Sequence, residues 1–234
     1  MLQRQLSIRD CDCACNCLLR PSALFSMMQI IAGDHCRDVG IGRAATFDRG
    51  FLWVLARQKL EILRMPEYGE EVTLETWAGD TKHFLFPRYY RMLDREGGTL
   101  LSSSSLWTLI DAEKRSVISP QKEGLAITGE STGHEIGLPT GIRKHPGEQA
   151  RIFTVPYSYT DINGHMNNVR YLDIAEDMIP ELAGKGRLRE IGVEYSHEIR
   201  LGETMTVSLH REDNTCLFSG DGETHVFSLL LRYE

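Results

Sequence analysis

The sequence predicts an α+β fold that is built twice, with one long helix wrapped by a curved antiparallel sheet in each half. The first observation behind this prediction is an internal repeat. The turn Gly69-Glu70 recurs as Gly202-Glu203, and the two copies lie 133 residues apart. The second observation is that an apolar helical pattern precedes each turn and an alternating strand pattern follows it.

In the first half, we expect a strand, then a helix, then several long strands. The helix is expected from Ser22, which is suited to cap it after Pro21, to about Cys36. The glycines of the turn 94–98 suit a tight connection between two strands. The long strands are expected at about 51–64, 70–79, 83–94 and 99–111.

The second half repeats this order after a segment without periodicity. Residues 119–149 are rich in Gly, Pro, Ser, Thr and charge, which is typical of a linker. We therefore divide the chain into a first half at 1–118, a linker at 119–149 and a second half at 150–234. The helix of the second half is expected at about 168–179, and its strands at about 188–200, 203–211, 215–220 and 224–234.

Composition indicates a soluble globular protein. The 234 residues include 41% hydrophobic and 25% charged residues, which suffices for a core. A net charge of -7 argues against a general nucleic-acid binder. The longest apolar runs fall short of a membrane span, and no signal-peptide pattern opens the chain.

Six cysteines indicate a reducing compartment such as a bacterial cytosol. Cys11, Cys13, Cys15 and Cys17 alternate, so a strand would place their four thiols on one face. Neighbours at this spacing are poorly placed for disulfides, and zinc sites usually use a C-x2-C spacing. Reduced, packed thiols are therefore one interpretation, and a metal or redox role is the other. We expect no metal site and no cofactor.

The segment from Asp161 to Asn168 is the part of the sequence that points most directly to chemistry. Asp161, Asn163 and His165 place a carboxylate, an amide and an imidazole two residues apart, around a Gly. A helical pattern follows, and we expect unpaired N–H groups near Met166 to polarise a carbonyl. Helix capping and an ordinary Asn-Gly turn are the alternative interpretation. Capping leaves His165 unexplained.

Three segments resemble a known family. They are Asp161-x-Asn163-x-His165-x-Asn167-Asn168-Val-x-Tyr171, then Val193-Glu194-Tyr195-x-x-Glu198, and Trp53-Val54 to Arg57 with Arg64-x-Pro66-x-Tyr68-Gly69-Glu70. In these segments the chain resembles the plant-type and bacterial acyl-acyl-carrier-protein thioesterases. That resemblance implies a tandem, or double, hotdog fold.

The resemblance also implies site residues. Asp161, Asn163, His165 and Glu198 are the expected catalytic residues. Ile199 stands where the plant enzymes commonly have Cys, which argues against a thiol nucleophile and leaves a carboxylate mechanism. Asn167 and Asn168 are expected to bind substrate. Met27, Met28 and Ile31 are candidates for the acyl-tunnel wall, with ordinary core packing as the alternative.

The first half shows no such motif near Arg20-Pro21-Ser22, where we expect its equivalent, so a single active site is expected on the second half. The implied activity is hydrolysis of fatty acyl-acyl-carrier-protein, which releases free fatty acid and ends chain elongation in the bacterial cytoplasm. A coenzyme A thioesterase and a non-catalytic acyl-binding module are the alternatives. A homodimer is possible for this fold.

An acidic carrier protein would dock on basic residues. The expected docking residues are Arg143, Lys144, Lys185, Arg187 and Arg189, with solvated loop charge as the alternative for each.

Overall fold

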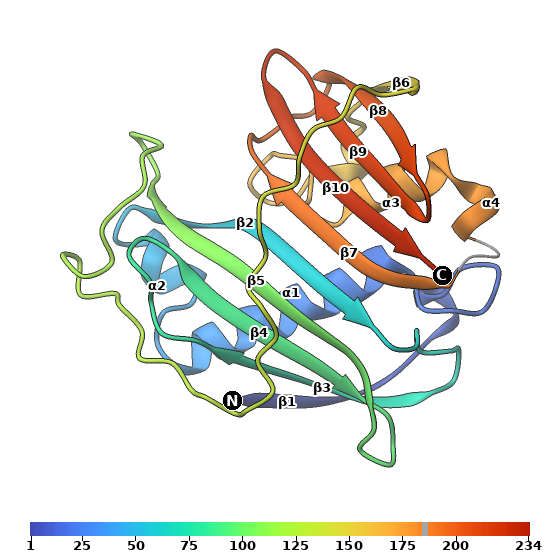
Figure 1. The fold of residues 1–234 in the computed structure, drawn as a ribbon. Helices are drawn as coiled ribbons and strands as arrows, with labels where there is room; N and C mark the ends of the chain where they lie inside the picture. The colour runs from blue at the N-terminus through green and yellow to red at the C-terminus, as the bar shows by residue number, and fades with distance from the viewer. Residues whose placement is uncertain (184–186) are drawn as a thin grey trace.

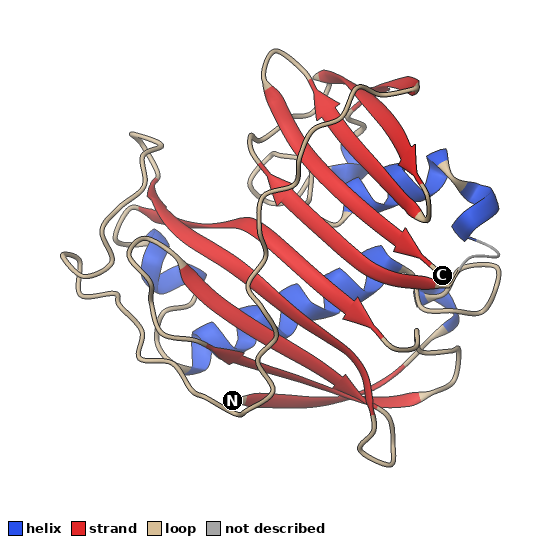
Figure 2. Ribbon diagram, in the orientation of Figure 1, coloured by secondary structure: helices blue, strands red, loops and turns tan. Residues whose placement is uncertain are grey.

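The computed structural model describes residues 1–183 and 187–234, and these contain one antiparallel sheet of ten strands with helices on one face (Figures 1 and 2). The first half holds β1 (Leu2–Ser7), β2 (Phe51–Ile62), β3 (Glu71–Ala78), β4 (Phe86–Leu93) and β5 (Thr99–Asp111). The second half holds β6 (Gln149–Thr154), β7 (Leu188–Tyr195), β8 (Thr204–Glu212), β9 (Thr215–Asp221) and β10 (His225–Tyr233). The helices are α1 (Pro21–Asp38), α2 (Arg43–Phe47), α3 (Arg170–Met178) and α4 (Pro180–Ala183), with short 3-10 turns η1 (Asp10–Asp12) and η2 (Tyr157–Tyr159).

The strand order confirms that the fold is built twice. It runs β1-β3-β4-β5-β2-β7-β10-β9-β8-β6. From one edge to the centre the order is β1-β3-β4-β5-β2, and from the other edge it is β6-β8-β9-β10-β7, so equivalent strands of the two halves follow the same order. The halves join where β2 pairs with β7, with Leu60 opposite Ile191. Gly69 and Gly202 both adopt positive φ, at +81° and +79°, which explains why both copies of the turn use glycine.

The two long helices bury one face each in a common core. Pro21 opens α1, and Leu24, Phe25, Met28 and Ile31 are almost fully buried at helical spacing. Tyr171, Leu172, Ile174, Ala175 and Met178 do the same on α3. Both sets belong to one hydrophobic cluster with side chains from both halves of the sheet. Each fully buried large apolar side chain contributes about 1.5–3 kcal/mol, so the halves stabilise each other.

The described part of the linker forms no helix or strand between 112 and 148, and it crosses the sheet face opposite the helices (Figure 1). It is bonded to that face. Ser104 Oγ donates to Gly137 O at 2.7 Å, and Ile142 N–H donates to Glu194 Oε2 at 2.9 Å. The division at 118 and 150 stays a prediction, since the shared sheet and core unite the halves.

The cysteine segment Cys11–Cys17 is not a strand, so the expectation that a strand places its four thiols on one face is wrong. Asp10 accepts the N–H of Cys11 at 2.8 Å, and Asn16 accepts that of Leu18 at 3.1 Å. Cys17 adopts φ +63°. These local bonds fold the segment into η1 and a tight turn, because short polar side chains compete with strand pairing. Its four thiols therefore do not share one face: Cys13 is buried, and Cys11, Cys15 and Cys17 are exposed.

The strand that precedes α1 lies upstream instead, as β1. Strand β6 is the strand expected before the helix of the second half, and the short helices α2 and α4 were not predicted. Among the described helices, none is long and apolar enough to cross a membrane. The described residues also contain no cluster of His, Cys, Asp and Glu suited to a metal ion.

Candidate active site

A tight turn presents three of the predicted catalytic side chains together. Asp161 N–H donates to His165 O at 2.9 Å, and Gly164 N–H donates back to Asp161 O at 3.0 Å. Gly164 has φ +77°, which a side chain would disfavour. Both carboxylate oxygens of Asp161 accept bonds from Asn163, at 2.8 Å from its backbone and 3.3 Å from its side chain. Asp161 therefore also has the turn-forming role of the alternative interpretation.

The fold brings Glu198 to this turn, although it lies 33 residues beyond His165. Met166 N–H donates to Ile199 O at 2.8 Å, and His165 pairs in an isolated bridge with Arg200. This pairing places His165 Nε2 2.5 Å from Glu198 Oε2. Because that carboxylate accepts the Nε2 proton, the other imidazole nitrogen is the one able to accept a proton.

The surroundings keep His165 neutral. Burial lowers the pKa of His165, and the positive charges of Arg200 and Arg115 lower it further, against smaller opposing effects of Asp161 and Glu203. Glu198 also forms an ion pair with Arg115. A neutral imidazole oriented by a carboxylate is an arrangement suited to proton transfer.

Two arginines of the first half complete the site, and the sequence analysis missed both. Arg43 at the start of α2 donates to Asn163 Oδ1 at 2.9 Å. Arg115 pairs with Glu198 from the turn after β5, where it adopts φ +53°. Asp111 holds that turn by accepting the Lys114 N–H at 2.8 Å. The strand ending at Asp111 was predicted, but nothing in the sequence indicates that the next turn meets Glu198.

The start of α3 differs from the expectation. The helix begins at Arg170 and not near Met166, because Asn167 Oδ1 accepts the N–H of Val169 at 3.1 Å and closes a turn before it. Met166 N–H bonds Ile199 O and Asn167 N–H bonds Tyr159 O at 2.8 Å, so neither is free to polarise a carbonyl.

The predicted substrate-binding residues have structural contacts of their own. Asn168 O accepts the Tyr195 hydroxyl at 3.0 Å. Met28 and Ile31 are buried in the core, and Met27 packs at its margin. Met28 Sδ also accepts a bond from Gln58 Nε2 at 3.2 Å. Substrate contact by these residues stays a prediction.

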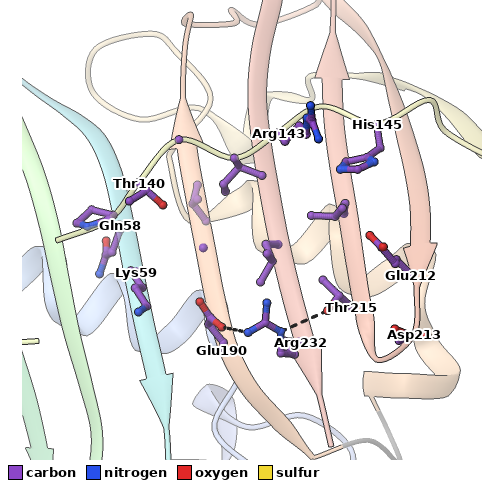
Figure 3. A pocket seen from close by; sticks show the side chains of 17 residues that line it. Gln58, Lys59, Thr140, Arg143, His145, Glu190, Glu212, Asp213, Thr215 and Arg232 are labelled. Carbon is purple, nitrogen blue, oxygen red and sulfur yellow. Dashed lines mark hydrogen bonds and ion pairs between the residues drawn. The ribbon is translucent and has the colours of Figure 1, made fainter. Parts of the chain in front are cut away.

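Two cavities lie away from the turn. One, of about 420 Å³, lies between the linker and the outer face of β2, β7, β9 and β10, where Arg232 pairs with Glu190 at 2.6 Å (Figure 3). The other, of about 210 Å³, lies beside Ala14 and Leu18. Neither cavity is lined by Asp161, His165 or Glu198.

The first half contains a turn of the same geometry. Ala14 N–H donates to Leu18 O at 2.9 Å, as Asp161 does to His165 O, and Leu19 N–H donates to Pro66 O at 2.9 Å, as Met166 does to Ile199 O. The isolated bridge Cys13–Leu19 likewise matches Thr160–Met166. The first-half equivalent of the catalytic turn was expected near Arg20-Pro21-Ser22. The structure places it a few residues earlier, at 14–18.

The equivalence shows what differs between the two turns. Ala14, Asn16 and Leu18 stand at the positions of Asp161, Asn163 and His165, and Met65 stands at the position of Glu198. The acid, the imidazole and the orienting carboxylate are thus absent from the first-half turn. Of the two equivalent turns, only the one in the second half carries the candidate catalytic residues.

Comparison with known proteins identifies the family. The model described as acyl-ACP thioesterase N-terminal domain matches residues 2–128, and the model described as acyl-ACP thioesterase C-terminal domain matches residues 143–226. The chain belongs to the acyl-ACP thioesterase family. The family resemblance seen in the sequence is thereby confirmed.

Curated members of the acyl-ACP thioesterase family from plants align with most or all of the chain. A chloroplastic palmitoyl-acyl carrier protein thioesterase of Cuphea hookeriana is 25% identical over 100% of this chain and 59% of its own length. The chloroplastic oleoyl-acyl carrier protein thioesterase 1 of Arabidopsis thaliana is 24% identical over 82% of this chain and 58% of its own length. The chain thus spans less than two thirds of these relatives.

Solved structures of the family show the same fold. An acyl-ACP thioesterase from Bacteroides thetaiotaomicron superposes with a TM-score of 0.89 at 24% identity, covering 99% of this chain and 97% of that one. The 12:0-ACP thioesterase of Umbellularia californica superposes with a TM-score of 0.83 at 18% identity, covering 100% of this chain and 96% of that one. The tandem hotdog prediction is confirmed.

Proposed function

We propose that this chain hydrolyses the thioester of fatty acyl groups on acyl carrier protein and releases free fatty acid. The observation that supports this most directly is the 2.5 Å contact between His165 and Glu198, in the turn that also presents Asp161 and Asn163. Family membership supports the acyl-acyl-carrier-protein substrate, which the names of the plant relatives state for those proteins.

The proposed reaction forms a C–O bond at the acyl carbon and breaks its C–S bond. Asp161 either attacks the carbonyl and gives an anhydride, or takes a proton from the attacking water. On the water route, this proton passes through the free nitrogen of His165 to the leaving sulfur. On the anhydride route, the thiolate leaves and takes a proton from solvent, and water then hydrolyses the anhydride. Glu198 orients the imidazole and stabilises the imidazolium that forms. Single-turnover hydrolysis in heavy-oxygen water separates the two routes, because only an anhydride exchanges an Asp161 oxygen with the product.

Arg43 and Arg115 act in this scheme as positioning residues. Arg43 holds the Asn163 amide, whose task is to orient the substrate or the water. Arg115 holds Glu198 against His165 and keeps the imidazole neutral through its charge. The first half therefore supplies part of the site, besides the acyl-tunnel wall that we assign to Met27, Met28 and Ile31. Asn167 and Asn168 would flank the bound substrate.

We propose that the acidic carrier protein docks on basic residues of the linker and of the segment around the start of β7. Lys144 pairs with Asp221 at 2.7 Å, and Arg187 lies 3.6 Å from Glu234, which Arg189 also contacts. Lys185 lies outside the described residues. We propose the bacterial cytoplasm as the location, since the described cysteines are free thiols. Release of the fatty acid there would end chain elongation. A homodimer stays a prediction.

The test compares hydrolysis of one acyl group on carrier protein and on coenzyme A by the wild type and by Asp161→Ala. We expect a preference for the carrier-bound substrate and a loss of about 10²–10⁴ in turnover for Asp161→Ala. Glu223→Ala, an exposed carboxylate remote in sequence from the turn, is the matched control and should keep wild-type turnover. Undiminished turnover in Asp161→Ala would reject the assignment, and a preference for coenzyme A would reject the carrier.

A further inference from the structure

The 210 Å³ cavity occupies the first-half counterpart of the active site. Its wall includes Ala14, Leu18 and Met65, which stand at the positions of Asp161, His165 and Glu198. The second half closes it with Leu188 on β7 and Tyr233 on β10. The first half has thus lost the catalytic side chains but keeps a cavity beside the turn.

A single carboxyl group from α3 reaches this cavity. Glu176 lines it, although the neighbouring Ala175 and Met178 belong to the buried face of the helix. Among the described residues, no hydrogen bond or ion pair to the Glu176 carboxyl group is found, and its backbone carbonyl accepts the Ile179 N–H at 3.1 Å. Burial raises the pKa of Glu176 to about 7, with Asp173 and Asp177 adding to this effect and Arg20 opposing it. A carboxyl group in this state can donate a hydrogen bond near neutral pH.

Positive charge surrounds the same cavity. Arg20, Arg64 and Arg187 line it, and Glu67 is the one acidic residue besides Glu176 among its lining residues. Arg20 Nε donates to Cys13 O at 2.9 Å and has no carboxylate partner among the described ion pairs, whereas Arg64 pairs with Glu70. A protonated acid beside arginine suits an anion and disfavours a cation.

The remaining wall is apolar. Leu18, Leu19, Pro21, Met65 and Leu188 line the cavity together with the ring of Tyr233. Its volume equals about seven times the ~30 Å³ share of one water molecule in the liquid. It therefore has room for a short hydrocarbon segment beside a small anionic group.

We propose that this cavity binds a free fatty acid, with the carboxylate accepting hydrogen bonds from Glu176 and Arg20 and the first methylenes against Leu18 and Met65. The ligand class rests on the proposed function, because that reaction produces fatty acid. The site itself does not need turnover. The fatty acid would bind at a place distinct from the catalytic turn, as a second molecule on the same chain.

The test measures binding of octanoate by calorimetry between pH 6 and pH 8.5, in the Asp161→Ala background so that the catalytic carboxylate is absent. Glu176→Gln keeps a hydrogen-bond donor and cannot ionise, whereas Glu176→Ala removes the donor. We expect Glu176→Ala to weaken binding by roughly ten- to hundredfold at pH 6. We also expect binding to the Glu176-containing chain to weaken as pH rises through about 7, while Glu176→Gln stays nearly flat. The other titratable or charged groups of the cavity wall are Arg20, Arg64, Glu67, Arg187 and Tyr233, and burial raises the pKa of Tyr233.

Three results would overturn the proposal. One is octanoate binding that Glu176→Ala leaves unchanged, and another is tighter binding of octylamine than of octanoate. The third is equal affinity in a Leu18→Trp variant, which fills the cavity without adding a charge, once circular dichroism has shown that it is folded. A chain that binds octanoate as expected but hydrolyses no acyl thioester would leave this site standing and reject the proposed function alone.

Discussion

Replacement of Glu176 by Gln tests the electrostatics of the core directly. The native fold holds the pKa of this carboxyl at about 7, against an ordinary value of 4.5. A raised pKa means that the fold favours the protonated form. The resulting stability is fully present below about pH 4.5 and is lost as the pH rises through 7.

The size of the effect follows from the same two values. At about 1.36 kcal/mol for each pH unit, the gap between 4.5 and about 7 corresponds to roughly 3 kcal/mol. The side chain lines an open cavity, so solvent reduces this figure, and we expect about 2 kcal/mol. The Gln side chain of Glu176→Gln cannot ionise, so this variant should not lose this stability as the pH rises.

The assay is urea denaturation of both chains at several pH values from 5 to 8.5, with unfolding free energies taken at a constant denaturant slope. Between pH 5 and pH 8.5, the unfolding free energy of Glu176→Gln should rise by about 2 kcal/mol relative to that of the wild type. Glu223→Gln, which removes an exposed carboxylate from the turn between β9 and β10, is the control and should track the wild type. Parallel pH curves for Glu176→Gln and the wild type would show that the carboxyl is not desolvated in the way argued here.

Three further predictions concern the site and the core. Glu198→Gln should lower turnover by about 10²-fold or more with little change in thermal stability, because it removes the carboxylate that orients His165; unchanged turnover would contradict this. Arg115→Ala should raise the pKa of His165, so the acidic limb of the pH–rate profile should move to higher pH, and a shift to lower pH would contradict the sign. Met28→Ala should cost about 2–5 kcal/mol in urea denaturation, because the side chain is buried in the common core; a cost under 1 kcal/mol would place Met28 on a cavity wall.

The repeated elements were predictable because their signals are local. Alternation located β2 to β5 and β7 to β10 within a few residues, and the Gly-Glu turns marked equivalent corners at Gly69 and Gly202. Edge strands β1 and β6 gave no such signal. Their burial is slight, so no apolar alternation shows in the sequence. The fold name came from the resemblance, since periodicity gave only helices wrapped by sheets.

The site was predictable only in part. Asp161, Asn163 and His165 share one turn and stand out in the sequence, whereas Glu198 was identified by resemblance alone. Arg43 and Arg115 reach the site through tertiary packing between halves, which no local pattern records. The predicted start of α3 was wrong because Asn167 closes a turn ahead of the helix. The cysteine segment was wrongly predicted as a strand because Asp10 and Asn16 form turns in place of strand pairing.

The pairing of β2 with β7 has a consequence for the integrity of the chain. Either half alone would expose one of these strands as an unpaired edge, offering a template for self-association. Fusion of the two copies lets each edge satisfy the other within one molecule. Separately expressed halves should therefore aggregate or reassemble with each other, and proteolytic nicking of the connecting segment should leave a complex that stays together without a covalent link.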